Sequence, residues 1–196
     1  MKNKIFTFII ISFIFVLDVL SLLAQPGKIK DEIAGYTKNL PFSINEFNVP
    51  AFPAKKYNIV DFGAVGDGIT KNTEIFKKVV DSCFNSGGGE IIVPPGIWLT
   101  GPIILKSNIN LHLERGALIQ FTKNFDDYPL IETTYEGQGQ FRCISPVYGC
   151  DLQNIAITGE GVIDGGGGAW RPVKKYKLTD LQWKELISSG GVVRVL

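Results

Sequence analysis

Adjacent carboxylates are the first feature of this chain that could do chemistry. Asp126 and Asp127 stand side by side, and two carboxyl groups in different environments can divide the acid and base roles of a hydrolysis. They follow Phe125 in the polar stretch NFDDYP, which we interpret as a loop rather than a catalytic pair. Asp164, in VIDGGGG, is expected to be a turn residue whose carboxylate accepts backbone N–H bonds.

Two further aspartates lie in a glycine-rich segment, YNIVDFGAVGDGITKNT. Asp61 and Asp67 could suggest a calcium loop, but the segment lacks the spaced oxygen ligands of a calcium motif. The glycines instead predict tight turns between a strand and a helix. The single histidine, His112, alternates with leucines and should point outward from its strand into solvent. The sequence therefore assigns no catalytic, cofactor-binding or metal-binding residue, and we expect no cofactor.

The N-terminus has the pattern of a secretory signal peptide. Lys2 and Lys4 precede an apolar run from residue 5 to residue 17, and the small residue Ala24 offers a cleavage site. We therefore assign residues 1–24 as a signal peptide, with an uncleaved membrane anchor as the alternative. Both interpretations export the rest of the chain, which predicts a secreted or periplasmic protein with no membrane contact after cleavage.

Three cysteines bear on the state of an exported chain. The odd count leaves at least one thiol unpaired. Cys83 lies on the apolar face of a predicted helix, where we expect a small buried hydrophobe. Cys143 and Cys150 could form a disulfide or could both be buried without pairing, and the sequence leaves both possibilities open. No cysteine spacing resembles a metal site.

The elements that would position these residues change along the chain. Residues 25–54, with four prolines, are predicted to be an extended lead-in, followed by a first strand over 57–62. Residues 72–85 should form a helix, with Asn72 as its N-cap and Gly87–Gly89 ending it. One face of this helix is apolar and should cover the end of a sheet; it comprises Ile75, Phe76, Val79, Val80, Cys83 and Phe84.

Short strands with alternating apolar residues follow the helix, and glycine, proline and asparagine turns separate them. No helical stretch joins them, which excludes the crossovers of a doubly wound fold. The predicted strands are 90–93, 97–100, 102–105, 109–113, 117–121, 155–158 and 161–164.

An internal repeat favours a solenoid over a β-sandwich. SNINLHLERGALI, from Ser107, aligns with QNIAITGEGVI, from Gln153, after a two-residue shortening before the last strand. Asn108 matches Asn154, an offset of 154 − 108 = 46 that we interpret as about two turns of a coil of some 23 residues. The alternative is a sandwich with coincidental similarity.

Several of these strings together resemble the N-terminal portion of glycoside hydrolase family 28, which comprises polygalacturonases and related pectin hydrolases. They are DFGAVGDGITKNT, GGGEIIVPPGIWLTGPIILKSNINLHLERGALIQF and NIAITGEGVIDGGGGAW, and the resemblance covers residues 57–170. It implies an all-β, right-handed, single-stranded parallel β-helix of the pectin-lyase type, with residues 55–196 as its N-terminal coils and the helix as its cap. The interior would be filled by Ile103, Leu105, Ile109, Leu111 and Leu118.

The resemblance also implies a chemistry, which is hydrolysis of α-1,4-galacturonosyl linkages in pectin with inversion. An aspartic acid protonates the leaving oxygen while other carboxylates activate a water, with the carboxyl groups roughly 6.5–9.5 Å apart. The family holds these residues in NTD, GDD and GHG strings and binds the substrate carboxylate with an RIK string, and none of these strings occurs here. Trp98 and Trp170 could stack on sugars or pack in the core or a turn, and both interpretations are equally supported.

The C-terminal residues, VVRVL, place apolar side chains where a solenoid would need a polar cap or another coil. We therefore expect an amino-terminal fragment of a longer enzyme, inactive by itself and monomeric when complete. Its partner would be a pectic polysaccharide, either galacturonan or rhamnogalacturonan. A formal net charge of +1 gives no case for nucleic acid. Two alternatives stay open: a pectate-lyase-type polysaccharide lyase of the same fold, using calcium, and a non-catalytic β-helix.

Overall fold

The computed structural model of this chain describes residues 35–44, 49–171 and 173–189. The signal peptide predicted for residues 1–24 lies outside the described residues, and so does the C-terminal VVRVL. The chain divides into two compact units, Met1–Val49 and Pro50–Leu196, and this division falls within the predicted lead-in. In the first unit, residues 35–37 form a helical turn. The second unit contains the strands.

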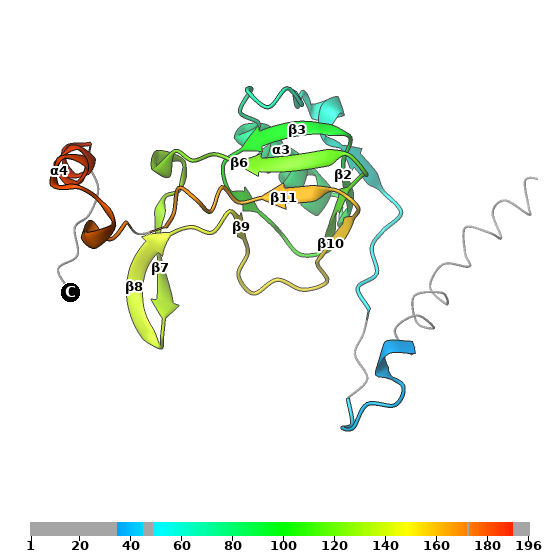
Figure 1. The fold of residues 1–196 in the computed structure, drawn as a ribbon. Helices are drawn as coiled ribbons and strands as arrows, with labels where there is room; N and C mark the ends of the chain where they lie inside the picture. Colours follow the sequence, from blue (N-terminus) through cyan, green and yellow to red (C-terminus); the bar gives the residue numbers. More distant parts are fainter. Residues whose placement is uncertain (1–34, 45–48, 172, 190–196) are drawn as a thin grey trace, which may run out of the picture. The chain divides into compact units, whose positions relative to one another are not determined.

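The described part of the second unit is a parallel β-helix built on three parallel sheets (Figure 1). Strands distant in sequence become neighbours because the chain returns to each sheet once per coil. This confirms the predicted fold class. The first sheet has the order β1 (Lys56–Asn58), β2 (Gly89–Val93), β5 (Ile109–Leu113), β10 (Ala156–Gly159); the second contains β3 (Gly96–Thr100), β6 (Ala117–Phe121) and β11 (Val162–Asp164); the third pairs β4 (Ile103–Ile104) with β9 (Val147–Tyr148).

The strand register gives the length of each coil. Between β2 and β5 a coil takes 20 residues, since residue 89 pairs with residue 109 (109 − 89 = 20). Between β5 and β10 it takes 46, since residue 110 pairs with residue 156 (156 − 110 = 46). The alignment of Asn108 with Asn154 is therefore correct, but its interpretation as two turns is wrong, because the 46 residues form one enlarged coil. The two-residue shortening is confirmed, since β6 and β11 are offset by 44 residues (162 − 118 = 44).

An antiparallel hairpin accounts for the extra length of this coil. β7 (Leu130–Tyr135) and β8 (Gln138–Cys143) pair with each other and with none of the three sheets. At the base of the hairpin, the Ile144 amide donates to the Pro129 carbonyl at 3.0 Å. The hairpin projects from the coils in Figure 1. Sequence patterning missed both strands because neither contains a buried residue, so no apolar alternation marks them.

Helix α3 (Thr73–Asn85) covers one end of the coils, as predicted. Its buried side chains join the same apolar cluster as the interior residues of β2 and β5; they are Phe76, Val79, Val80 and Cys83. Ile75 packs against this cluster in part, whereas Phe84 is 41% exposed at the edge of the predicted face. The helix thus shields the apolar interior at this end from water.

The segment before α3 differs from its predicted form. The first strand ends at Asn58, and Ile59–Phe62 forms a 3-10 helix, η1, instead of continuing as a strand. The Asn58 side chain explains the change, because it accepts a hydrogen bond from the Val60 amide at 3.0 Å and caps this turn. Gly63 ends η1 with a φ of 96°, a conformation that favours glycine.

Asn72 occupies the N-cap position of α3, but its side chain makes no capping hydrogen bond. Its Oδ1 accepts from the Val65 amide at 2.8 Å, and its Nδ2 donates to the carbonyl oxygens of Thr70 at 2.9 Å and Leu99 at 3.2 Å. Asn72 is almost fully buried, and these bonds satisfy it there. Its side chain therefore fastens the glycine-rich turn to β3.

The interior side chains stack from coil to coil. Four of the five predicted interior residues are buried, namely Ile103, Leu105, Ile109 and Leu111. The prediction for the fifth, Leu118, is wrong. Leu118 is only half-buried and faces outward, because the alternation of β6 turns its neighbours inward. The inward residues of β6 are Ala117, Ile119 and Phe121.

The residues before β1 are fastened to the far edge of the first sheet by an asparagine pair. Asn108 and Asn154 both adopt left-handed conformations, with φ of 63° and 54°. The Asn154 Nδ2 donates to Asn108 Oδ1 at 3.1 Å and to the Ala51 carbonyl at 2.7 Å, and the Ala51 amide donates to Asn154 Oδ1 at 3.0 Å. Ala51 thus contacts the turn before β10, although it lies five residues before β1.

The chain after β11 contains elements that the sequence analysis did not predict. A 3-10 turn, η3 (Lys175–Lys177), precedes helix α4 (Asp180–Ser188). Thr179 and Gln182 form a capping box that begins α4, and none of the α4 residues is buried. Within the described ranges, no helix is long and apolar enough to cross a membrane.

Candidate functional site

Asp126 and Asp127 do not form a catalytic pair. They lie in the 3-10 helix η2 (Phe125–Asp127), where Asp126 is exposed and Asp127 is half-buried. Asp127 accepts hydrogen bonds from Lys71 Nζ and from Thr122 Oγ1, both at 2.7 Å. These two bonds lower the pKa of Asp127 below its ordinary value, and the bond from Lys71 has the larger effect. A carboxyl group held ionised in this way is a poor general acid.

Asp67 has a comparable structural role in the glycine-rich turn. Its Oδ1 accepts from the amides of Thr70 at 2.7 Å and Ile69 at 2.8 Å, and its Oδ2 accepts from Thr70 Oγ1 at 2.7 Å. The bond from the Thr70 amide is the main reason that the pKa of Asp67 is lowered. Within the described residues, no group of three His, Cys, Asp or Glu side chains could hold a metal ion.

Asp164 is the last residue of β11, and its carboxylate accepts a backbone N–H bond, as predicted, from the Gly166 amide at 2.9 Å. The chain then reaches Trp170, whose ring meets the edges of Phe125 and Tyr128 with centroid distances of 4.7 and 4.8 Å. Trp170 therefore packs η2 against the segment after β11.

Trp98 lies in the interior and is not available to a sugar. It is 3% exposed, and its Nε1 donates to the Pro94 carbonyl at 2.8 Å. For both tryptophans, the structure thus favours packing over sugar stacking.

His112 points outward from β5, as predicted, but it belongs to a polar network rather than standing free in water. Its Nδ1 lies 2.8 Å from Thr158 Oγ1, and this hydroxyl donates to Asn110 Oδ1 at 3.0 Å. Asn110 Nδ2 in turn donates to Glu90 at 3.0 Å, and Glu90 pairs with Lys56 at 3.3 Å. The network joins all four strands of the first sheet, so hydrogen bonds within the sheet explain why these polar residues lie on it.

The cysteines differ in part from their prediction. Cys83 is buried, as expected, and burial raises the pKa of its thiol to about 11. Cys143 and Cys150 are both exposed and unpaired, so neither the disulfide nor the buried arrangement is correct. Cys143 lies on the hairpin, which has no buried side, and Cys150 lies in an exposed turn where its Sγ donates to Asp151 at 3.3 Å.

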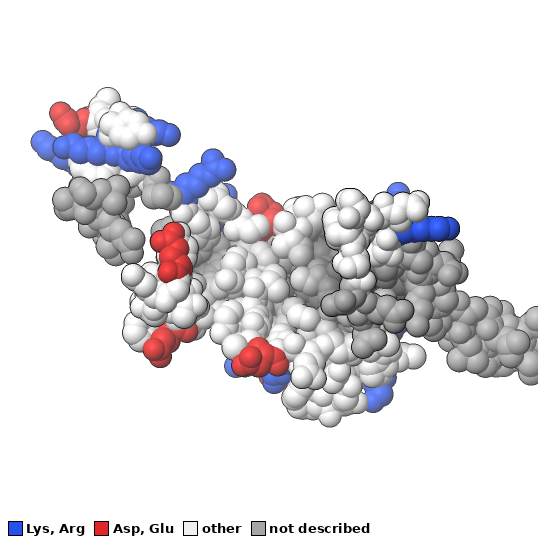
Figure 2. All heavy atoms as spheres, turned by 90° about the horizontal axis from the view of Figure 1, so that it is seen from below, with Lys and Arg blue, Asp and Glu red and all other residues white. Residues whose placement is uncertain are grey.

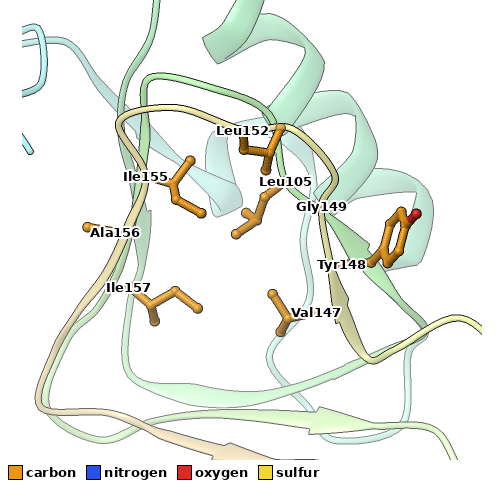
Figure 3. A pocket seen from close by; sticks show the side chains of 8 residues that line it. All are labelled: Leu105, Val147, Tyr148, Gly149, Leu152, Ile155, Ala156 and Ile157. Atoms are coloured by element: carbon orange, nitrogen blue, oxygen red, sulfur yellow. The ribbon is translucent and has the colours of Figure 1, made fainter. Parts of the chain in front are cut away.

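The described coils have an apolar pocket of about 460 Å³ at the end opposite α3 (Figure 3). Leu105, Val147, Leu152, Ile155 and Ile157 point into it, whereas Ala156 points away, as strand alternation requires. The sequence marked Leu105 as an interior residue, and the repeat marked Ile155 and Ile157. The sequence predicted an uncapped solenoid, but it did not identify the residues that line this pocket.

Two columns of stacked interior side chains change from buried to exposed within one coil. In the first sheet, Ile91 and Leu111 are 0% exposed, whereas Ile157, the next in register, is 46% exposed. In the second sheet, Ile119 is 0% exposed, whereas Ile163 above it is 40% exposed. The pocket is thus the exposed end of the β-helix interior, and it has the chemistry of a packing surface rather than of a catalytic cleft.

The comparisons with known proteins agree with this architecture, although no family model matches the chain. The chain is 36% identical over 134 residues to a probable polygalacturonase of Vitis vinifera, covering 64% of this chain and 27% of that protein. A hyperthermoactive exopolygalacturonase from Thermotoga maritima superposes with a TM-score of 0.58 and 36% identity, over 74% of this chain and 36% of that one. For a family 28 exopolygalacturonase of Yersinia enterocolitica the TM-score is 0.53 and the identity 36%, over 58% and 21%.

These similarities confirm the resemblance to glycoside hydrolase family 28 over most of the chain. They also confirm the pectin-lyase-like parallel β-helix, since the similar structures have that fold. The chain spans about a quarter of the length of the curated relative and about a third or less of the two solved proteins.

Proposed function

We propose that these coils belong to a secreted pectin hydrolase of the polygalacturonase type, which hydrolyses α-1,4-galacturonosyl linkages with inversion. The observation that carries the proposal is a parallel β-helix that is 36% identical to polygalacturonases over more than half of the chain. Export by the signal peptide at residues 1–24, a pectic polysaccharide as substrate and a monomeric state are part of the same proposal.

The described coils act in this proposal as a platform rather than as the catalytic machinery. Inverting hydrolysis needs a protonated acid and a base whose carboxyl groups lie roughly 6.5–9.5 Å apart. The two described aspartates with shifted pKa values, Asp67 and Asp127, are both held ionised by hydrogen bonds. We therefore assign the acid and the base to further coils, which would stack on the apolar pocket around Ile157 and bury it.

The test is product analysis with polygalacturonate and rhamnogalacturonan as substrates. We expect the complete gene product to release saturated oligosaccharides or galacturonate with new reducing ends, and the 196-residue chain alone to release none. Unsaturated products that disappear with a chelator would establish a lyase instead. If the complete product released no sugar from any pectic polymer, the non-catalytic β-helix would be the correct interpretation.

A further inference from the structure

One short segment of this chain carries several positive charges and no negative one. Residues 171–177 contain four cationic side chains, Arg171, Lys174, Lys175 and Lys177, and no acidic one. The whole chain has 20 Lys and Arg against 19 Asp and Glu, so the remainder has a formal charge of −3 (20 − 4 = 16; 16 − 19 = −3). A polyanion would therefore be attracted to this segment and weakly repelled by the remainder.

The charges of this segment are available to a ligand. We call Val173–Lys177 the basic arm, and all five of its residues are exposed. The ion pairs found within the described ranges do not include the arm; their cations are Lys56, Lys71, Lys106 and Arg115. Cationic side chains are visible on η3 and α4 in Figure 2.

A local turn orders the side chains of the arm. The Lys177 amide donates to the Lys174 carbonyl at 2.9 Å, which closes the 3-10 turn η3. Lys175 and Lys177 lie within this turn, and Lys174 precedes it in an extended conformation. Tyr176, between them, is 77% exposed, with Lys174 Nζ 5.9 Å from its ring centroid. The arm thus presents an aromatic ring flanked by ammonium groups.

We infer that the basic arm binds the carboxylates of an unesterified polyuronate chain, an inference that rests on the proposed function for its choice of ligand. Each uronate unit presents one carboxylate and one apolar C–H face. The lysines suit the carboxylates because an ammonium group acts as a compact point charge. The Tyr176 ring suits the C–H face because it offers a large apolar surface beside a polar tip.

The test compares two matched variants of the full chain in affinity electrophoresis through polygalacturonate. K174Q/K175Q removes two adjacent lysines from the arm, and K77Q/K78Q removes two adjacent exposed lysines from α3, with the same change in net charge. We expect K174Q/K175Q to weaken binding roughly tenfold at low salt and K77Q/K78Q to leave it nearly unchanged. Y176A should also weaken binding, and fully methyl-esterified pectin should not bind any variant. Circular dichroism should show the same fold throughout, because every substituted residue is exposed.

Several results would overturn this inference. Equal losses of affinity in the two lysine variants would mean that net charge alone governs binding. No loss of affinity in either variant would mean that the arm does not bind polygalacturonate. Equal affinity for dextran sulfate, or tighter binding to vesicles of anionic lipid, would show that the arm does not select uronates. Binding is measured on the 196-residue chain and hydrolysis on the complete gene product. Lost binding with hydrolysis intact therefore removes only the arm, whereas lost hydrolysis with binding intact removes only the proposed function.

Discussion

At the scale of single residues, the carboxylate of Asp127 joins parts of the chain that are distant in sequence. It accepts from Lys71, 56 residues earlier, and from Thr122 at the end of β6. Asp67 and Asp164 likewise accept bonds from nearby amides in their own turns. Asp67, Asp127 and Asp164 are thus hydrogen-bond acceptors that shape turns and junctions.

We expect Asp127→Asn to lower the free energy of unfolding by about 1–2 kcal/mol at neutral pH, because Lys71 loses a charged partner. The pKa of Asp127 is lowered in the folded state, so its contribution is present above the unfolded value near 3.8 and is lost as the pH falls through the folded value. Urea unfolding measured at successively lower pH should therefore show the unfolding free energies of the unmodified chain and of Asp127→Asn becoming equal. Asp126→Asn, at the exposed neighbour, is the control, and an equal loss in it would contradict this account.

Asn154 is the second residue for which we predict the effect of a substitution on stability. Asn154→Gly keeps the left-handed turn but removes the bonds to Ala51 and Asn108, which we expect to cost about 1–2 kcal/mol of unfolding free energy. Hydrogen exchange should show faster exchange of the Ala51 amide. Asp151→Gly, another left-handed position without these contacts, should leave that amide protected. Faster exchange in both variants would mean that the asparagine does not hold Ala51.

At the scale of elements, burial decides what could be predicted from the sequence. β5 and β6 were predicted with their observed bounds, because alternate residues such as Leu111 and Ile119 face the interior and leave a clear pattern. η1 was missed because it depends on a single hydrogen bond, which the Asn58 side chain accepts from the Val60 amide. The hairpin was missed because it buries nothing, and without it the 46-residue repeat could not be recognised as one coil.

The hairpin should be removable without loss of the β-helix. Its base is already closed by the bond between Ile144 and Pro129, so replacing residues 130–143 with a short Asn-Gly turn should preserve the coil. We expect the circular dichroism spectrum to remain that of a β-sheet protein, reduced by the loss of β7 and β8. The unfolding free energy should change by less than about 1 kcal/mol, since isolated two-stranded hairpins contribute little stability. Loss of cooperative unfolding would show that the hairpin supports the coils.

At the scale of the whole molecule, the two ends of the described coils are unlike. One end is covered by α3, whereas the other exposes the apolar pocket. The sequence identified the fold, and none of the family's NTD, GDD and GHG strings occurs in it. It could not show the pocket or the exposed arm, because both depend on which side chains remain uncovered after the coils stack.

The exposed apolar pocket should promote self-association of the chain. Ile157→Asp should reduce self-association in sedimentation and the fluorescence of anilinonaphthalene sulfonate, because it places a charge in the pocket. Val162→Asp, at a residue that is 59% exposed but does not line the pocket, is the matched control and should change neither reading. Similar effects of both variants would mean that net charge, and not the pocket, controls association.

The central claim is that these coils belong to an inverting polygalacturonase-type hydrolase, and the anomeric configuration of the first product tests it most directly. Proton NMR of polygalacturonate treated with the complete gene product would follow the new reducing ends before they mutarotate. Inversion at an α linkage predicts that the β-anomer appears first. Initial release of the α-anomer, or formation of an unsaturated sugar, would contradict the claim.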